Sequence, residues 1–504
     1  MATTSTPYST VRPLMGAAPT WLGAADAERI ESYRIYEDMY WNAPETFVLM
    51  QRGSESNPIY IPSAKVIIEA TNRYLGVGFD YLVDPRVGTP ADQLVAQGQL
   101  ERLFKREMLW TKFSTQKRFG LIRGDAIWHI IGDAAKLPGS RISIYEVDPA
   151  SYFPIYEDDN LDRLVGVHLV DQVEYEKKVV VRRQTYRKVP GTTTITTELA
   201  LFEAGKWDDR DSTPYGEGST GKQSEELKLV KQLVPVTPLD VKITALPVYQ
   251  VCNMRTPSSP FGSSELRGLE RISAAVNQGI SDQELALALD GIGLYATTSG
   301  PPTDVDGNEV NWILGPGRVV EIDPETDFKR VAGVSSLPAL EHVKFLLEEQ
   351  RRAAGVPDIA AGMVDVTVAE SGIALSLQLS PLLAKNAEKE QEMLGVYDHM
   401  LYDIVQMWLP TYEGVSPGLE VEVASIVQDA MPVNREARVA ELLALLAAKV
   451  ISAEYAREEL TKYGYDFPAE MGEAIVAETT ALTAATGYDP FASRVSSELE
   501  ESTL

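Results

Sequence analysis

The segment Asp304-Val305-Asp306-Gly307-Asn308 carries residue types that could bind a calcium ion. An EF-hand calcium loop also needs a bidentate glutamate at its twelfth position. Counted from Asp304, that position is Gly315, so the ligand set is incomplete. Asp-Gly is also a strong hairpin signal, and the segment is therefore predicted to be a turn between strands.

Gly315-Pro316-Gly317-Arg318 is a weak candidate for a phosphate-binding loop. A P-loop requires Gly-Lys followed by Ser or Thr, at the start of a helix. Neither feature follows this segment, and the motif does not occur elsewhere in the chain. ATP hydrolysis is therefore not expected.

Residues that could act as nucleophiles, bases or metal ligands are scattered along the chain. Cys252 is the only cysteine and the four histidines are far apart, so no internal disulfide, thiolate cluster or zinc site is expected. Carboxylate pairs such as Asp358 with Asp365, or Glu348 with Glu349, are better explained as a solvated acidic surface. No Ser-His-Asp order or nucleophile elbow is present. The sequence therefore predicts neither an enzyme nor a cofactor.

The chain is strongly acidic: its 504 residues include 73 Asp plus Glu against 46 Lys plus Arg, a formal net charge of −27. This argues against tight nucleic-acid binding, because Lys and Arg make the contacts to phosphate. It fits a solubilising surface, or the wall of a tube through which DNA slides without sticking. No apolar run approaches the roughly 20 residues that cross a bilayer, so no membrane association is expected.

The elements of the first half of the chain predict an α+β fold. The first residues, 1–24, lack a secretion signal and are expected to form a disordered tail. Apolar residues at helical spacing indicate helices over about 25–51 and 90–119, and Thr89 is the expected N-cap of the second.

Strand-like patterns follow from 121 to 202 and predict one antiparallel sheet, with a hairpin around Pro190-Gly191. His129 and His168 fall in these strands and are expected to be structural. The segment 205–228 is rich in Gly, Ser and charge and is predicted to be a surface loop.

The middle of the chain predicts two helices that flank a small β module. The first is expected over 263–290, and the second after Ser336, its expected N-cap. Between them, short β-like runs at 293–298, 310–314 and 318–322 indicate the module. The apolar spacing on the first helix predicts a seam that joins copies of the chain, formed by Leu266, Leu269, Ile272 and Val276.

A loop-like run and a long helix come next. The run 356–369 is rich in Val and Ala and lacks Lys and Arg. The helix is expected from Glu370 to about Leu409, with a kink where Pro381 cannot bond to the carbonyl of Leu377. A strand is then expected at 419–427, followed by helices capped by Asn434 and Ser452.

Several motifs resemble those of the portal proteins of tailed double-stranded DNA phages. Phe261-Gly262-Ser263-Ser264-Glu265-Leu266, Val276-Asn277-Gln278 and Ser281-Asp282 are similar to the first stem helix of that family. Each motif is short, and their order along the chain gives the resemblance its specificity.

Further motifs agree with the same family, of the long-tailed phage type. Ala354-Gly355-Val356-Pro357-Asp358 and Glu370-Ser371-Gly372-Ile373-Ala374-Leu375 resemble its tunnel loop and the start of its long helix. Gly124-Asp125-Ala126 and Val147-Asp148-Pro149 resemble its sheet region. The resemblance covers roughly residues 25–491.

The resemblance implies a portal fold, which is α+β. Its parts in chain order would be a disordered tail at 1–24, an α/β wing at 25–261, a first stem helix at 262–291, a β-containing clip at 292–334, a second stem helix at 335–355, a tunnel loop at 356–370, a long kinked helix with a wing strand at 371–430, a helical crown at 431–487 and a disordered tail at 488–504.

The resemblance also implies a function and partners. Portals are rings, twelve-fold in the virion, at one capsid vertex, and double-stranded DNA passes through them during packaging and ejection. The implied partners are further copies of the chain, the terminase large subunit at the clip, head-completion and adaptor proteins, and the major capsid and scaffolding proteins. The implied location is the virion, after assembly in the host cytoplasm.

Three more groups of residues are expected to serve this role. The narrowest part of the channel would be lined by Asp358, Ile359, Met363, Val364, Asp365 and Val366, although an ordinary buried strand is the alternative. Basic residues that could face DNA are Lys344, Arg351 and Arg352, and pairing with Glu341, Glu348 and Glu349 on the same helix is an equal alternative. The clip interface would use Trp312 and Arg318, although Trp312 could instead pack inside the β module.

Two other functions stay open on the sequence alone. One is a different virion subunit, such as a tail or capsid protein, which would lack the helix–β–helix unit. The other is a hydrolase that uses the scattered carboxylates.

Overall fold

The computed structural model of the chain describes residues 11–12, 24–47, 49–50, 58–84, 88–157, 160–203, 229–257, 259–292, 294–297, 309, 328–331, 337–363, 372–415, 421–428, 435–448, 456 and 460. The chain divides into two units, Met1–Ala430 and Met431–Leu504. The second unit begins at the residue from which the resemblance implies a crown, and α8 (Arg435–Ala447) belongs to it. The expected caps Asn434 and Ser452 lie outside the described residues.

The larger sheet of the first unit is an antiparallel meander. It consists of β6 (Asn160–Tyr175), β7 (Lys178–Lys188), β8 (Ile195–Glu203) and β9 (Leu229–Pro238), and the long β6 also pairs with β5 (Tyr152–Glu157) and β1 (Val11–Arg12). The hairpin predicted around Pro190-Gly191 is confirmed, because Lys188 pairs with Ile195 and Gly191 takes a φ of +73°. The predicted loop at 205–228 lies outside the described residues.

A helix covers part of this sheet. It is α1 (Ala24–Trp41), and Ile30 and Tyr33 on it pack against Val170 and Phe202 of the strands. After α1 the chain forms the short 3-10 helix η1 (Pro44–Thr46) and then α2 (Ser63–Arg73).

A second sheet is separate from the first, so the prediction of one sheet over 121–202 is wrong. Its strands run in the order β10 (Val248–Cys252), β3 (Asp125–Gly132) and β4 (Ile142–Val147). The chain leaves β4 through the 3-10 helix η2 (Pro149–Ser151), where the Asp148 carboxylate accepts from the Ala150 N–H at 2.8 Å. This turn carries the chain out of one sheet and into β5 of the other.

The predicted helix over 90–119 is two helices, α3 (Pro90–Glu107) and α4 (Leu109–Arg123). Met108 separates them with a left-handed φ of 50°. The Thr89 cap is confirmed, since the Thr89 hydroxyl accepts from the Asp92 N–H. Both helices contribute to the main core, which they share with β3, β4 and the long helix described next.

That long helix is α7 (Gly372–Asp403), and the π-helical η3 (Ile404–Glu413) extends it. The helix continues through Pro381. The carbonyl of Leu377, which Pro381 cannot bond, accepts instead from the Ser380 hydroxyl at 2.8 Å. Beyond η3 the predicted strand at 419–427 is β13 (Val423–Gln428), which pairs antiparallel with β2 (Val77–Val83).

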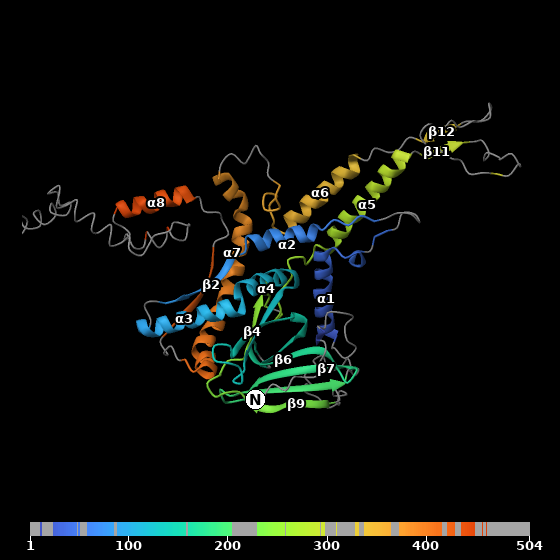
Figure 1. Cartoon of the computed structure of the whole chain (residues 1–504). Coiled ribbons are helices and arrows are strands. Elements are labelled where there is room, and N and C mark those ends of the chain that lie inside the picture. The colour runs from blue at the N-terminus through green and yellow to red at the C-terminus, as the bar shows by residue number, and fades with distance from the viewer. Residues whose placement is uncertain are drawn as a thin grey trace, which may run out of the picture. The chain divides into compact units, whose positions relative to one another are not determined.

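The helix–β–helix unit consists of α5 (Glu270–Ile292), β11 (Leu294–Thr297), β12 (Phe328–Val331) and α6 (Leu337–Ala353). The strands β11 and β12 pair antiparallel at the far end of the two helices (Figure 1). The sequence predicted β11 but not β12, and Trp312, Arg318 and the cap Ser336 lie outside the described residues. The start predicted for the first helix, Ser263, is wrong, because 265–268 form a turn in which Gly268 has a φ of +86°.

Candidate functional site

The two helices of the helix–β–helix unit are joined by direct contacts and run in opposite directions. The Gln350 amide near the end of α6 donates to the Ser273 hydroxyl near the start of α5 at 2.7 Å. About two helical turns further along, the Val343 side chain packs against Gly279, where a β-carbon would lie only 2.8 Å from it. The pair is therefore a packed antiparallel hairpin of helices, which can support the β pair at its end (Figure 1).

The residues predicted to form an oligomer seam pack largely within one chain. Leu266 and Leu269 precede α5 instead of belonging to it. Together with Val276 they are buried within a single chain, and Ile272 is half-buried. Their apolar spacing is explained by the chain's own core, so substitutions there would test folding before assembly.

The segment before α5 crosses the end of α4 at two glycines. A β-carbon on Gly124 would lie 2.6 Å from the Gly262 carbonyl oxygen, and one on Gly262 would overlap the backbone of Gly124 and Asn253. The Asp125 carboxylate accepts from the Gly262 N–H at 2.9 Å and from the Tyr33 hydroxyl at 2.6 Å. Two of the motifs that carry the family resemblance, Gly124-Asp125-Ala126 and Phe261-Gly262-Ser263, therefore meet in space.

A third motif joins the same crossing. Arg123, directly before Gly124, is bound by Asp148 of Val147-Asp148-Pro149 at 2.9 Å and by Glu37 at 2.5 Å. Burial raises the pKa of Asp125, and its hydrogen bonds oppose the rise. The resemblance assigned Gly124-Asp125-Ala126 and Val147-Asp148-Pro149 to the sheet region and Phe261-Gly262-Ser263 to the first stem helix. It did not predict that the three motifs contact one another.

The fourth motif, Asn277-Gln278 with Ser281, holds two short stretches of the chain against α5. These stretches, residues 49–50 and 58–61, are called the strap. The Asn277 side-chain oxygen accepts from the Ile61 N–H at 2.8 Å, and the Gln278 oxygen accepts from the Met50 N–H at 2.6 Å. The Ser281 hydroxyl accepts from the Ile59 N–H at 2.9 Å. The polar side chains of α5 thus satisfy the strap's backbone, which explains polar residues at these helical positions.

Three elements meet at a buried carboxylate at the base of the hairpin. Glu265, whose side chain is fully buried, forms ion pairs with Lys385 and Lys389 of α7. Lys385 also donates to the carbonyl of Ala354 at the end of α6, at 2.8 Å. Burial raises the pKa of Glu265, but the two lysines outweigh it and hold the pKa below its usual value. Burial lowers the pKa of Lys389 to about 8, although Glu265 opposes this.

The chain leaves α6 through two successive glycine caps. At Gly355, with φ +67°, the Val356 N–H bonds to the Arg351 carbonyl at 2.9 Å, and the Gly355 N–H bonds to that of Arg352 at 3.0 Å. This is the Schellman arrangement. The same pattern recurs at Gly362, seven residues later, where φ is +86° and the Met363 N–H bonds to the Asp358 carbonyl at 2.9 Å.

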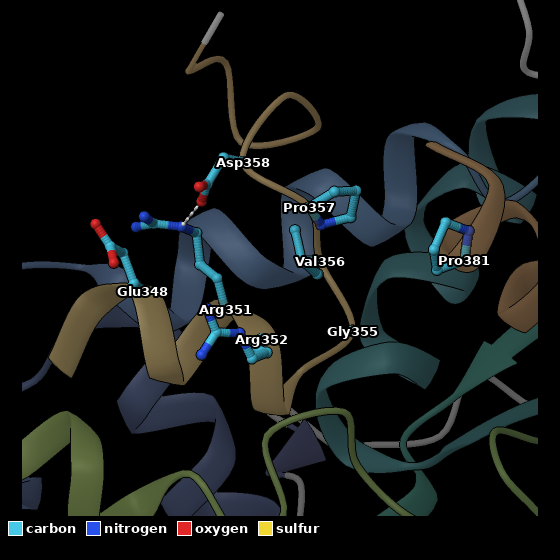
Figure 2. Close-up of a pocket in the computed structure, with 8 residues that line it drawn as sticks. All are labelled: Glu348, Arg351, Arg352, Gly355, Val356, Pro357, Asp358 and Pro381. Atoms are coloured by element: carbon cyan, nitrogen blue, oxygen red, sulfur yellow. Dashed lines mark hydrogen bonds and ion pairs between the residues drawn. The ribbon is translucent and has the colours of Figure 1, made fainter. Parts of the chain in front are cut away.

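The described part of the predicted tunnel loop, residues 356–363, is thus a hydrogen-bonded turn. An open cavity of about 280 Å³ lies beside it (Figure 2). Its lining joins α6, the turn and α7 and consists of Glu348, Arg351, Arg352, Gly355, Val356, Pro357, Asp358 and Pro381. Apolar Val356, Pro357 and Pro381 form one part, and charged side chains the other.

The candidate channel residues have mixed positions. Met363 is 54% exposed, Ile359 is half-buried, and the Asp358 side chain is 59% exposed. Val364, Asp365 and Val366 lie outside the described residues. The alternative of an ordinary buried strand does not describe 356–363, because these residues form a turn.

The three cations expected to face DNA differ. Arg351 is corrected: its side chain is only 9% exposed and donates to Asp358 at 2.6 Å, so it is turned inward and neutralised. Arg352 is exposed but pairs with Glu349 of the same helix. Lys344 is exposed, and it is the one of the three with no ion pair among the described residues.

The two histidines in the strands occupy structural positions. His129 is buried and its Nε2 lies 2.9 Å from the Tyr186 hydroxyl, while Nδ1 of His168 lies 2.8 Å from the Thr185 hydroxyl. Burial lowers the pKa of both to about 3, and for His168 Arg183 and Arg187 lower it further. Within the described residues, His, Cys, Asp and Glu side chains do not gather in any group able to hold a metal ion. Nor does any described helix have the length and apolarity to span a membrane.

Comparisons with known proteins give structural likeness only. No protein-family model and no curated protein sequence matches the chain. A chain from the virion of a native gene transfer agent particle is similar in structure, with 11% identity and a TM-score of 0.43, over 81% of this chain and 96% of that one. A chain from the neck of an empty gene transfer agent particle, computed with C6 symmetry, has 13% identity and a TM-score of 0.44, over 89% and 95%. At these values the likeness does not extend to function.

Proposed function

We propose that copies of this chain form a portal, a ring-shaped channel at one capsid vertex through which double-stranded DNA is packaged and later ejected. The observation that carries the proposal is the hairpin of α5 and α6 with the β11–β12 pair at its end (Figure 1). A helical hairpin that bears a small β module fits the stem and clip that the sequence resemblance implies. The role proposed is structural, without catalysis or a cofactor.

The contacts around the base of the hairpin support the proposal. The motifs that resemble the portal family are the residues that fix the hairpin to the body: Gly262 at the glycine crossing, Glu265 at the lysines of α7, and Asn277 at the strap. Packing and hydrogen bonds of this kind hold a functional element in a defined position. The resemblance and the packing therefore concern the same residues.

Charge also fits a channel for DNA. Phosphate binding by many cations would trap DNA, because each neutralised phosphate releases counterions. The chain has a net charge of −27, and Arg351 and Arg352, which precede the predicted tunnel loop, pair with Asp358 and Glu349. The turn therefore offers little grip to a passing phosphate backbone.

The partners of the proposed portal follow from its parts. The clip, 292–334, would dock the terminase large subunit and afterwards the head-completion and adaptor proteins, with Trp312 and Arg318 as contact residues. The wing would contact the major capsid and scaffolding proteins, and the ring would be a dodecamer in the virion.

Electron microscopy of the purified full-length chain tests the proposal. Rings with a central hole wide enough for duplex DNA, about 20 Å, are expected. Monomers, or tubes and shells without a closed ring, would contradict it and favour an enzyme or another virion subunit. Crosslinks from terminase should map to 292–334, and crosslinks confined to 431–487 would contradict the assignment of the clip.

A further inference from the structure

The solvent side of α6 carries a stripe of three side chains that no described part of the chain covers. Glu341, Phe345 and Glu348 recur at helical spacing and lie on the face opposite Val343 and Gln350, which are buried against α5. Phe345 is 54% exposed in the middle of the stripe, with His342 beside it at 6.5 Å between ring centroids. An exposed phenylalanine between two carboxylates is a candidate contact residue.

The charge of this stripe is acidic. Glu341 and Glu348 are exposed and form no ion pair with any residue that the structure describes. Arg352 follows on the same side of the helix, but Glu349 neutralises it. Lys344 is exposed beside the stripe, about 60° around the helix from Glu341 and about 40° from Glu348, so it offsets one of the two negative charges.

A second stripe, on α2 and the end of α1, has the opposite charge. Lys65, Val66 and Arg73 are exposed on α2. Glu69 lies between them, but Arg118 binds it at 2.9 Å and Tyr40 donates to it at 2.6 Å, so its charge is satisfied within the chain.

An exposed aromatic ring belongs to this second stripe. Trp41, at the end of α1, is 58% exposed, and the Lys65 ammonium lies 5.7 Å from its ring centroid. Lys65 and Arg73 form no ion pair within the part of the chain that the structure covers. The second stripe is thus apolar with two cations that have no anionic partner.

The two stripes match in spacing as well as in charge. Glu341 and Glu348 are separated by about 10 Å along α6, and Lys65 and Arg73 by about 12 Å along α2. We propose that α6 of one copy docks on α2 and the end of α1 of the next copy, with Phe345 against Trp41 and Val66. This inference rests on the proposed function, since it names the subunit contact of the ring.

The geometry of such a contact fits a ring. The two stripes belong to different elements, so copies can join head to tail, and a repeated head-to-tail contact closes into a ring or continues as a filament. Aromatic residues at the centre with charged residues around them are typical of contacts in which the aromatic residues supply the affinity and the charges the specificity.

Charge reversal of each stripe tests the contact. The first variant is Glu341→Lys with Glu348→Lys, and the second is Lys65→Glu with Arg73→Glu. Each alone places like charges opposite one another, so the assembled fraction is expected to fall about tenfold or more. Co-expression of the two should restore assembly, because α6 of each chain then meets an α2 of opposite charge on the other.

A matched control for the first variant changes the net charge by the same amount at other sites. Glu101→Lys with Glu176→Lys lies in α3 and the β6–β7 turn, and it should assemble like the unmodified protein. Circular dichroism and thermal unfolding of each variant confirm folding, and Phe345→Ala gives a second variant without any charge change. Its assembly should weaken while its unfolding temperature stays the same.

The outcomes separate the two proposals. If the unmodified chain forms no ring, the proposed function fails and this contact fails with it. If it forms rings and both reversed variants form them equally well, the contact is wrong while the portal proposal stands. If each variant fails alone and the mixture also fails, the two stripes do not face one another, and the inference is overturned.

Discussion

The Arg351 guanidinium donates to the Asp358 carboxylate at 2.6 Å, and this ion pair joins the last turn of α6 to the turn that follows it (Figure 2). The sequence assigned the two residues to different roles, a cation that faces DNA and an anion that lines the channel. In the structure each neutralises the other. The pair acts together with the caps at Gly355 and Gly362 to fix the path of the chain from α6 into the predicted tunnel loop.

Removing one partner of this pair should have unequal effects. Arg351 is 9% exposed and Asp358 is 59% exposed, so Asp358→Asn leaves a nearly buried cation without its anion, whereas Arg351→Gln leaves an anion in water. Asp358→Asn is expected to lower the free energy of unfolding by about 1–2 kcal/mol, and to speed amide exchange over 356–363. In a double variant, Arg351→Gln with Asp358→Asn, the free energy of unfolding should fall by less than the sum of the two single losses. Additive losses in urea unfolding would show that the pair does not couple these residues.

The glycine crossing gives a second prediction. Gly262→Ala would place a β-carbon in the backbone of Gly124 and Asn253. The backbones must then move apart, and the free energy of unfolding is expected to fall by about 3 kcal/mol or more. Gly98→Ala in α3 is the matched control, because a β-carbon there meets nothing within 4 Å. The free energy of unfolding of Gly98→Ala should rise by about 1 kcal/mol, because alanine has a higher helix propensity than glycine. Similar unfolding free energies for the two variants would contradict the crossing.

Local features of the fold were predictable from the sequence, and long-range ones were not. The Thr89 cap and the Pro190-Gly191 turn follow from chemistry within four residues, and both are confirmed. Leu266 and Leu269 have the spacing of a helix face, yet they precede α5. The reason is tertiary: the Glu265 N–H bonds to the Leu121 carbonyl, which sets the path of the turn.

The same limit applies to the candidate site. Periodicity shows that 121–202 contains strands, but it cannot show that β4 and β5 belong to different sheets, since that depends on pairings across the whole chain. The partner of Glu265, Lys389, lies 124 residues away, and the strap is held by α5 from 216 residues away. Polar residues on the otherwise apolar pattern of α5 were the available signal for the strap.

The strap should loosen when its hydrogen bonds to α5 are removed. Asn277 is fully buried and its side-chain oxygen accepts from the Ile61 N–H, so Asn277→Ala leaves a partly buried N–H without its acceptor. The free energy of unfolding is expected to fall by about 1–2 kcal/mol. Amide exchange should become faster only in 58–61 and α5. Ser281→Ala removes the hydrogen bond to the N–H of the more exposed Ile59, and the free energy of unfolding should fall by less than in Asn277→Ala. Unchanged exchange in the first variant would rule out the role assigned to Asn277.

Acid should destabilise the protein partly through its buried histidines. The folded pKa of His129 and of His168 is about 3, below the usual 6.5. Between these values the unfolded state binds protons that the folded state does not, so stability falls as the pH falls from 6.5 toward 3. His129→Asn should reduce the dependence of the unfolding free energy on pH by about 1.4 kcal/mol per pH unit between pH 4 and 6.

Met363 gives the prediction that bears most directly on the proposed channel. It is exposed at the end of the described turn, in a run without Lys or Arg. Met363→Lys would add one cation per copy, and a ring would present these cations together to the phosphates of passing DNA. Less DNA packaged per head and slower ejection are expected, and both effects should diminish as salt is raised, because the added contacts are electrostatic. Leu137→Lys, at an exposed position in the turn between β3 and β4, adds the same charge elsewhere and should have no effect. Packaging and ejection that match the control, in variants confirmed to form rings, would show that Met363 does not line the channel.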